Sequence, residues 1–189
     1  DKDSELNINN GTYLQMLTQI GREGYGSDID FAKAVVEATL IRTFNNVHRI
    51  TIRGEAGVIK TNSFDEVPTS LRFYAGGDKS VRGFDYREIS PTAEVIDPET
   101  GELIVDSIGG KYLATSSVEY AYQVADNWRV AAFVDAGTAT NDTSTTLTYS
   151  VGPGVHWLSP IGPVRLYVAR GFAPDENTWQ LHILLGPEL

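Results

Sequence analysis

The chain has 189 residues, enough for one domain with a sizeable core, and a formal net charge of −10 at pH 7. This acidic balance argues against nucleic-acid binding, because phosphate contacts need clustered Lys and Arg. The absence of cysteine excludes disulfide frameworks and thiolate-ligated metal sites. No apolar run reaches the ~18 residues of a transmembrane helix, which excludes helical membrane spans only.

Strict alternation of polar and apolar side chains predicts about eight strands. In chain order they cover residues 13–20, 31–44, 48–59, 112–124, 128–137, 149–157, 164–169 and 179–185. Residues 31–40 are rich in Ala and could form a helix, but their alternation and their strand neighbours favour a strand. Residues 1–10 do not have a strand pattern and are expected to form an irregular lead-in.

The connections between these strands alternate in length. Short turns at residues 45–46, 125–127 and 159–162 separate longer links at residues 21–30, 61–111, 138–147 and 170–178. This layout is typical of an outer-membrane β-barrel, with short periplasmic turns and long extracellular loops. The predicted fold is therefore an all-β, antiparallel, up-and-down transmembrane β-barrel. One long loop, residues 62–110, lies between its third and fourth strands.

The two faces of the strands differ in charge. A transmembrane barrel has a polar lumen and an apolar lipid-facing band, whereas a soluble ligand-binding barrel has the reverse. Charge placement favours the membrane barrel, because one face is almost free of charge at mid-strand; the other carries Lys33, Glu37, Arg53, Glu55, Glu119, Asp135, Arg165 and His182. Aromatic residues on the apolar faces predict two interfacial girdles: Tyr13, Phe44, Tyr122, Trp128 and Trp157 near the short turns, and Tyr112, Tyr149 and Trp179 near the long loops.

The sequence contains no pattern that is typical of an enzyme active site. His48, His156 and His182 are scattered and lack metal-ligand spacing, and no nucleophile elbow or phosphate loop is present. No cofactor and no catalytic residue are expected.

The long loop carries its own apolar residues around the run Val81, Arg82, Gly83 and Phe84, so it is expected to pack inside the barrel. An Arg offers a planar fork suited to carboxylates, and Glu119 and Asp135 both point inward on adjacent predicted strands. We expect Arg82 to pair with Asp135 and with Glu119. Phe84 is expected to pack near Phe133 and the small Gly137. Two roles for this pairing stay open, namely anchoring of the loop and a direct mechanical part in function.

Glycines are expected to thin the last three strands at Gly152, Gly154 and Gly186. Weakly paired strand edges, with the terminal strand ending at Leu189, could admit a client strand by β-augmentation. Simple curvature of the sheet is the alternative explanation.

Residues 72–86, with Val81-Arg82-Gly83-Phe84, and residues 133–137 resemble the conserved loop and the inner-wall strand motif of the BamA/TamA superfamily of outer-membrane assembly proteins. Glu119 falls where the preceding strand carries an acidic residue, and residues 157–163 resemble the penultimate turn. The ending, residues 185–189, is particularly similar to the TamA branch.

The resemblance implies that the chain is the C-terminal half of a larger barrel, at residues 1–189, in the bacterial outer membrane. It implies insertion and translocation of outer-membrane proteins and autotransporters by strand-edge templating, without covalent chemistry. The implied partners are the lipid bilayer, client proteins, upstream POTRA domains and a TamB-like inner-membrane protein. The half-barrel could close on itself as eight strands, or two copies could pair as a homodimer. A self-contained small outer-membrane barrel with a structural or pore role is the alternative, and a soluble ligand-binding β-barrel is the third.

Overall fold

The computed structural model describes residues 8–25, 27–96, 101–142, 147–160, 162–174 and 177–186. The expectations placed on residues 1–7, on residue 161 and on the terminal Leu189 lie outside these residues. Within the described part, none of the helical segments is long and apolar enough to cross a membrane.

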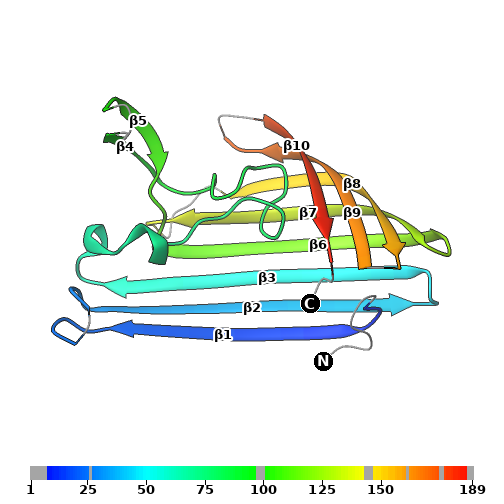
Figure 1. Cartoon of the computed structure of the whole chain (residues 1–189), viewed down its shortest axis with the longest axis horizontal. Helices are drawn as coiled ribbons and strands as arrows, with labels where there is room; N and C mark the ends of the chain where they lie inside the picture. The colour runs from blue at the N-terminus through cyan, green and yellow to red at the C-terminus, as the bar shows by residue number, and fades with distance from the viewer. Residues whose placement is uncertain are drawn as a thin grey trace.

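Eight antiparallel strands form one sheet in chain order, and a two-stranded hairpin lies apart from it (Figure 1). The sheet strands are β1 (Gly11–Gly21), β2 (Phe31–Phe44), β3 (His48–Thr61), β6 (Tyr112–Ala125), β7 (Trp128–Thr140), β8 (Thr148–Ser159), β9 (Gly162–Phe172) and β10 (Asn177–Leu185). All eight predicted strands are confirmed, including the Ala-rich β2. Short turns and long connections alternate as predicted. The β2–β3 turn places Asn45 and Asn46 at positive φ, as hairpin turns matching the strand twist require.

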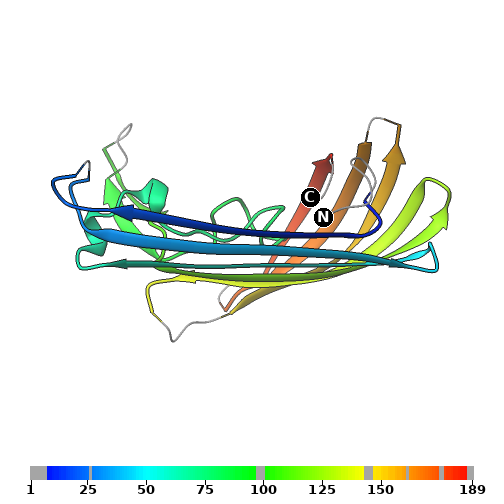
Figure 2. The same ribbon diagram turned by 90° about the horizontal axis from the view of Figure 1, so that it is seen from below.

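The sheet is an open trough, because β1 and β10 do not pair with each other in the described residues. Figure 2 shows β8, β9 and β10 curling away from the flatter part of the sheet formed by β1, β2, β3, β6 and β7. The β8–β9 ladder is interrupted at Gly152 and Pro153, although its register is the same on both sides. Pro153 has no N–H to donate, and Gly152 has no side chain to pack, so the sheet bends here at little cost.

The strand register sorts polar and apolar side chains onto opposite faces. The inner face, which the long loop covers, carries buried Glu119, Asp135 and His182. The outer face is apolar and exposed, and on β10 it presents Leu181 at 65% and Ile183 at 58% exposure. A soluble ligand-binding barrel would bury apolar side chains inside, so this arrangement excludes it and matches the lumen and lipid face of a membrane barrel.

The predicted aromatic girdles lie on the outer face, with one correction. Tyr13 was placed in the girdle near the short turns, but it pairs with Thr39 on the inner face. The register of β1 against β2 places Gly11 opposite the buried Ile41, so the odd-numbered residues of β1 point inward. The other girdle residues are on the outer face, and Trp128 and Trp157 stack across β7 and β8 with ring centroids 6.1 Å apart.

The long loop contains more regular structure than its sequence pattern indicated. It includes two 3₁₀ turns, η1 (Phe64–Glu66) and η2 (Thr69–Leu71), and the hairpin of β4 (Thr92–Ile96) and β5 (Leu103–Ser107). These strands have five residues each, too few for alternation to distinguish them from a loop. The base of the loop packs on the loop-side ends of β3, β6 and β7 in one apolar cluster: Ile29, Ile59, Phe64, Val67, Phe73, Ala75, Leu113 and Ala139.

Candidate functional site

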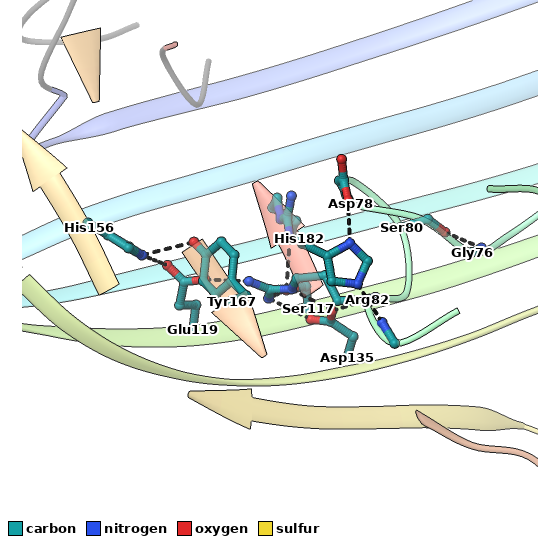
Figure 3. A network of polar contacts seen from close by, with 12 residues as sticks. Gly76, Asp78, Ser80, Arg82, Ser117, Glu119, Asp135, His156, Tyr167 and His182 are labelled. Atoms are coloured by element: carbon teal, nitrogen blue, oxygen red, sulfur yellow. Dashed lines mark hydrogen bonds and ion pairs between the residues drawn. The ribbon is translucent and has the colours of Figure 1, made fainter. Parts of the chain in front are cut away.

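Arg82 lies at the centre of the inner face and is 1% exposed. Its Nε and Nη2 donate to the two oxygens of Asp135 on β7, each at 2.8 Å, and its backbone N–H donates to Asp135 Oδ2 at 3.0 Å (Figure 3). Asp135 is fully buried. The carboxylate therefore accepts a two-pronged guanidinium and a backbone donor, which fixes both the position and the orientation of the loop at this point.

Glu119 on β6 is the second carboxylate in contact with Arg82. Arg82 Nη1 donates to Glu119 Oε2 at 2.6 Å, and Nη2 donates to Ser117 Oγ at 3.1 Å. Glu119 Oε1 lies 3.4 Å from His156 Nε2 on β8. The Tyr167 hydroxyl on β9 lies 2.9 Å from the same nitrogen. One loop arginine is thus tied to four successive strands, β6 to β9.

Two aromatic rings enclose the guanidinium. Arg82 Cζ lies 3.6 Å from the ring centroid of Phe133 and 4.5 Å from that of Tyr167. Burial by itself lowers the pKa of the Arg82 guanidinium, but the hydrogen bond and charge of Asp135, together with the charge of Glu119, raise this pKa above its ordinary value. The two carboxylates therefore favour the charged form of Arg82.

The next residues of the loop are held by β10, the terminal strand of the sheet. The Gly83 N–H donates to His182 Nε2 at 2.9 Å, and Thr178 Oγ1 donates to the Gly83 carbonyl. Gln180 Nε2 donates to Asp85 Oδ1 at 3.1 Å. Since Nε2 of His182 accepts a hydrogen bond, its ring proton is on Nδ1, which faces Asp78 Oδ1 (Figure 3). Alternate residues of β10 thus hold one turn of the loop.

Glycines on the sheet make room for the apolar residues of the loop. A Cβ on Gly171 of β9 would lie 2.7 Å from the ring of Phe84, and one on Gly137 of β7 would lie 2.7 Å from Val81 Cγ2. Phe84 thus packs on Gly171 of β9, whereas Gly137 faces Val81; the expected contact of Phe84 with Phe133 stays a prediction. Gly83 has a φ of +94°, which turns the chain after Arg82 and directs Phe84 toward β9. Phe133 lies under the guanidinium.

The three glycines expected to weaken the last strands have different roles. A Cβ on Gly152 would lie 2.0 Å from the Val168 carbonyl oxygen and 2.8 Å from the Phe133 ring, and one on Gly154 would lie 2.4 Å from the Tyr167 ring. Both glycines accommodate the rings that enclose Arg82. Gly186 lies just after β10, where its φ of +100° turns the chain out of the strand. The close approach of the Tyr167 ring accounts for Gly154, whereas at Gly152 the close approach coincides with the interruption of the β8–β9 ladder.

Several residues of the site were not singled out from the sequence as partners of the loop. Tyr167, His156 and Ser117 contact the Arg82 network, and Arg72 holds the base of the loop by donating to Val67 O at 2.8 Å and Asp65 O at 2.9 Å. Alternation predicts that the strand residues Tyr167, His156 and Ser117 point inward. It does not predict how each strand aligns with the next one. The described residues contain no cluster of His, Cys, Asp and Glu that could hold a metal ion.

His182→Leu is predicted to loosen the contact between the loop and β10. The substitution leaves the buried Gly83 N–H without its acceptor, which costs about 1–3 kcal/mol. Hydrogen exchange measured by mass spectrometry should accelerate in peptides covering residues 81–86 and 177–185. Gln180→Leu, which removes only the exposed contact to Asp85, serves as the matched control and should accelerate exchange less. Equal exchange in the two variants would contradict the assignment.

Comparison with known proteins places this geometry in a family. The Omp85 superfamily domain matches residues 1–186. The chain is 34% identical over 182 residues to the outer membrane protein assembly factor BamA of Nitratidesulfovibrio vulgaris, covering 93% of this chain and 22% of that protein. It is 29% identical over 197 residues to BamA of Neisseria meningitidis serogroup B, covering 85% of this chain and 24% of the relative.

Solved structures show the same fold. The crystal structure of Haemophilus ducreyi BamA lacking POTRA domains 1–3 superposes with a TM-score of 0.80 at 21% identity, over 98% of this chain and 40% of that one. The chain spans about a fifth of the length of the curated relatives it matches. The match of the family domain to nearly every residue shows that the chain belongs to the Omp85 superfamily.

Proposed function

We propose that this chain is the C-terminal barrel part of an outer-membrane protein assembly factor, and that its β10 edge templates an incoming client strand. The chain is an outer-membrane protein, in keeping with its apolar outer face and its superfamily. The observation that carries the proposal is the contact of the long loop with β10. Arg82 joins the loop to the interior strands, while His182 and Thr178 join the same turn to the edge strand.

An edge strand has one row of unpaired backbone groups, which another strand can bind by β-augmentation. In the described sheet β10 pairs with β9 alone, and β1 pairs with β2 alone. The loop holds β10 by side chains, so the outer row of backbone groups stays open to a client. Strand exchange at this edge needs neither covalent chemistry nor a cofactor.

The β1 edge is proposed to pair with strands that precede this chain. The chain spans about a fifth of its curated relatives, so the proposal assigns those strands to a part of the encoded protein outside this chain. This is the half-barrel arrangement expected from the sequence, with POTRA domains further upstream. A second copy of the chain, the homodimer expected as an alternative, would compete for the same edge. A self-contained eight-stranded barrel would need β1 to pair with β10.

The narrower assignment, a TamA-like protein with autotransporter clients and a TamB-like partner, remains a more specific form of the proposal. It rests on residues 185–189, of which 187–189 lie outside the described residues. The curated relatives reported above carry the name BamA, so the proposal is made for outer-membrane protein assembly in general. The identity of the clients captured in the experiment below distinguishes the TamA-like assignment from outer-membrane protein assembly in general.

Disulfide trapping tests the proposal, since the chain has no cysteine of its own. A cysteine at Leu181 of β10 in the full-length encoded protein should form a disulfide with a cysteine in the last strand of a client during assembly. A matched cysteine at Val130 of β7, which is paired on both sides, should form no such bond. Porin and autotransporter clients are tested in parallel. Capture at Val130 as efficient as at Leu181, or capture at neither position, would refute β10 templating.

A further inference from the structure

The outer face of the sheet has an unusual distribution of charge. Among the described residues of its eight strands, this face carries no Asp or Glu and only three Lys or Arg side chains, Arg42, Lys60 and Arg170. All three lie near strand ends. Arg42 is next to the short turns, whereas Lys60 and Arg170 are at the end where the long loops begin. A cation is costly at the middle of a bilayer and inexpensive near its interfaces.

Arg170 on β9 lies within a group of aromatic side chains. Its Cζ lies 5.1 Å from the ring centroid of Phe172 and 5.5 Å from that of Trp179 on β10. Phe172 in turn stacks on Tyr149 of β8, with centroids 5.0 Å apart. Both rings restrict the exposed guanidinium by cation–π contact. Arg170 forms no ion pair with any carboxylate among the residues that the structure describes.

We infer that Arg170, with Tyr149, Phe172 and Trp179, binds the phosphate group of a lipid headgroup in the outer leaflet. The side chain faces lipid, so the anion that neutralises it comes from the membrane. A long Arg side chain can extend along the apolar surface until its head reaches the interface. The planar guanidinium matches phosphate with paired hydrogen bonds, and the rings provide a surface for the adjoining acyl chains.

Lys60 provides an internal comparison. It lies on β3, on the same face and at the same end, and it has the same charge as Arg170. No aromatic ring contacts its ammonium group in the described residues, and an ammonium is a point charge rather than a fork. A built phosphate site therefore depends on Arg170 and not on Lys60. A general attraction of the positive outer rim for anionic lipid would depend on both residues equally.

The test uses the full-length encoded protein in nanodiscs of phosphatidylcholine with a small fraction of lipid A, whose headgroup carries phosphate. Native mass spectrometry after detergent exchange measures the lipid A retained per protein. Arg170→Gln should retain about tenfold less, the loss expected for one charge-assisted contact, whereas Lys60→Gln should stay within about twofold of the parent. Retention unchanged by Arg170→Gln, or lowered equally by Lys60→Gln, would overturn the site.

Two further arms sharpen the result. Millimolar inorganic phosphate should not displace lipid A; displacement would show a soluble-anion site and refute the lipid assignment. Trp179→Leu keeps the charge but removes one ring, and should reduce retention by a smaller factor than Arg170→Gln. It also replaces that variant if Arg170→Gln fails to fold, and unchanged retention would then refute the site. The lipid-binding inference depends on membrane embedding and not on assembly activity. Failure of the disulfide trapping experiment at β10 would therefore leave this inference standing, and failure of the lipid experiment would leave the proposed function standing.

Discussion

Arg82→Ala should destabilise the barrel by about 3–5 kcal/mol and release the long loop from the inner face. Removing the guanidinium leaves the fully buried Asp135 and the nearly buried Glu119 without their cation. Removal of one partner of a buried ion pair costs this much because the remaining charge is uncompensated. The thermal midpoint in detergent should fall, and it is measured from the gel mobility of the folded barrel. Residues 62–110 should become sensitive to protease, and client assembly should decline.

Lys79→Ala is the matched control, because Lys79 is an exposed cation three residues earlier in the same loop. It should leave both the thermal midpoint and the protease pattern unchanged. Arg82→Met combined with Asp135→Leu should cost less than the sum of the two single variants, since the double change removes both charges together. Additive costs would show that the two residues do not act as a pair.

The same measurement separates anchoring from a mechanical role. If the pair only anchors the loop, the loss of assembly in Arg82→Ala should follow the loss of stability. The double variant, in which Glu119 still lacks its cation, would then regain assembly only to the extent that it regains stability. If the pair moves during assembly, stability would return without activity. The two roles left open by the sequence thus predict different results for one variant.

Gly83→Ala should have the second-largest effect, again by displacing the loop. Gly83 has a φ of +94°, a conformation that costs a residue with a Cβ about 1–2 kcal/mol. Its Cβ would also lie 2.9 Å from the Gly171 backbone nitrogen and 3.1 Å from the Gly171 Cα. These atoms belong to the β9 backbone and cannot move independently, so overpacking adds about 1–3 kcal/mol.

Gly77→Ala isolates the conformational part of this cost. Gly77 has the same φ of +94°, but the nearest atom to its Cβ, Tyr86 Cα, would be 3.4 Å away. Gly77→Ala should therefore be destabilising by the backbone cost alone, and Gly83→Ala should be clearly worse in both thermal midpoint and protease sensitivity. Equal destabilisation by the two substitutions would show that close approach to β9 does not determine where the loop lies.

The contacts around Arg82 and Gly83 suggest how the two halves of the site work together. Arg82 connects the loop to β6 and β7 in the interior of the sheet, and the very next residue connects it to β10 at the edge. Displacement of the loop would thus release the edge strand from its side-chain contacts. This link is the physical basis for expecting loop variants to affect assembly at β10.

Alternation along the chain predicted the eight strands and their two faces, and it identified Glu119 and Asp135 as inward carboxylates. Alternation, turn residues and charge are local properties, so they define which side of each strand is polar before any neighbour is known. The same properties identified the long loop and its apolar run. The girdle assignment of Tyr13 was wrong on the same local grounds, because Tyr13 shares its face of β1 with Gln15 and Gln19, and the register with β2 agrees.

The partners of each loop residue follow from the three-dimensional arrangement of the strands. Arg82 and Asp135 are 53 positions apart in the chain, and Gly83 and His182 are 99 apart. Such contacts depend on the alignment of successive strands and on the curl of β8–β10, which no local pattern encodes. The recesses at Gly137 and Gly171 exist only once the loop backbone approaches the sheet, and they receive Val81 and Phe84 respectively.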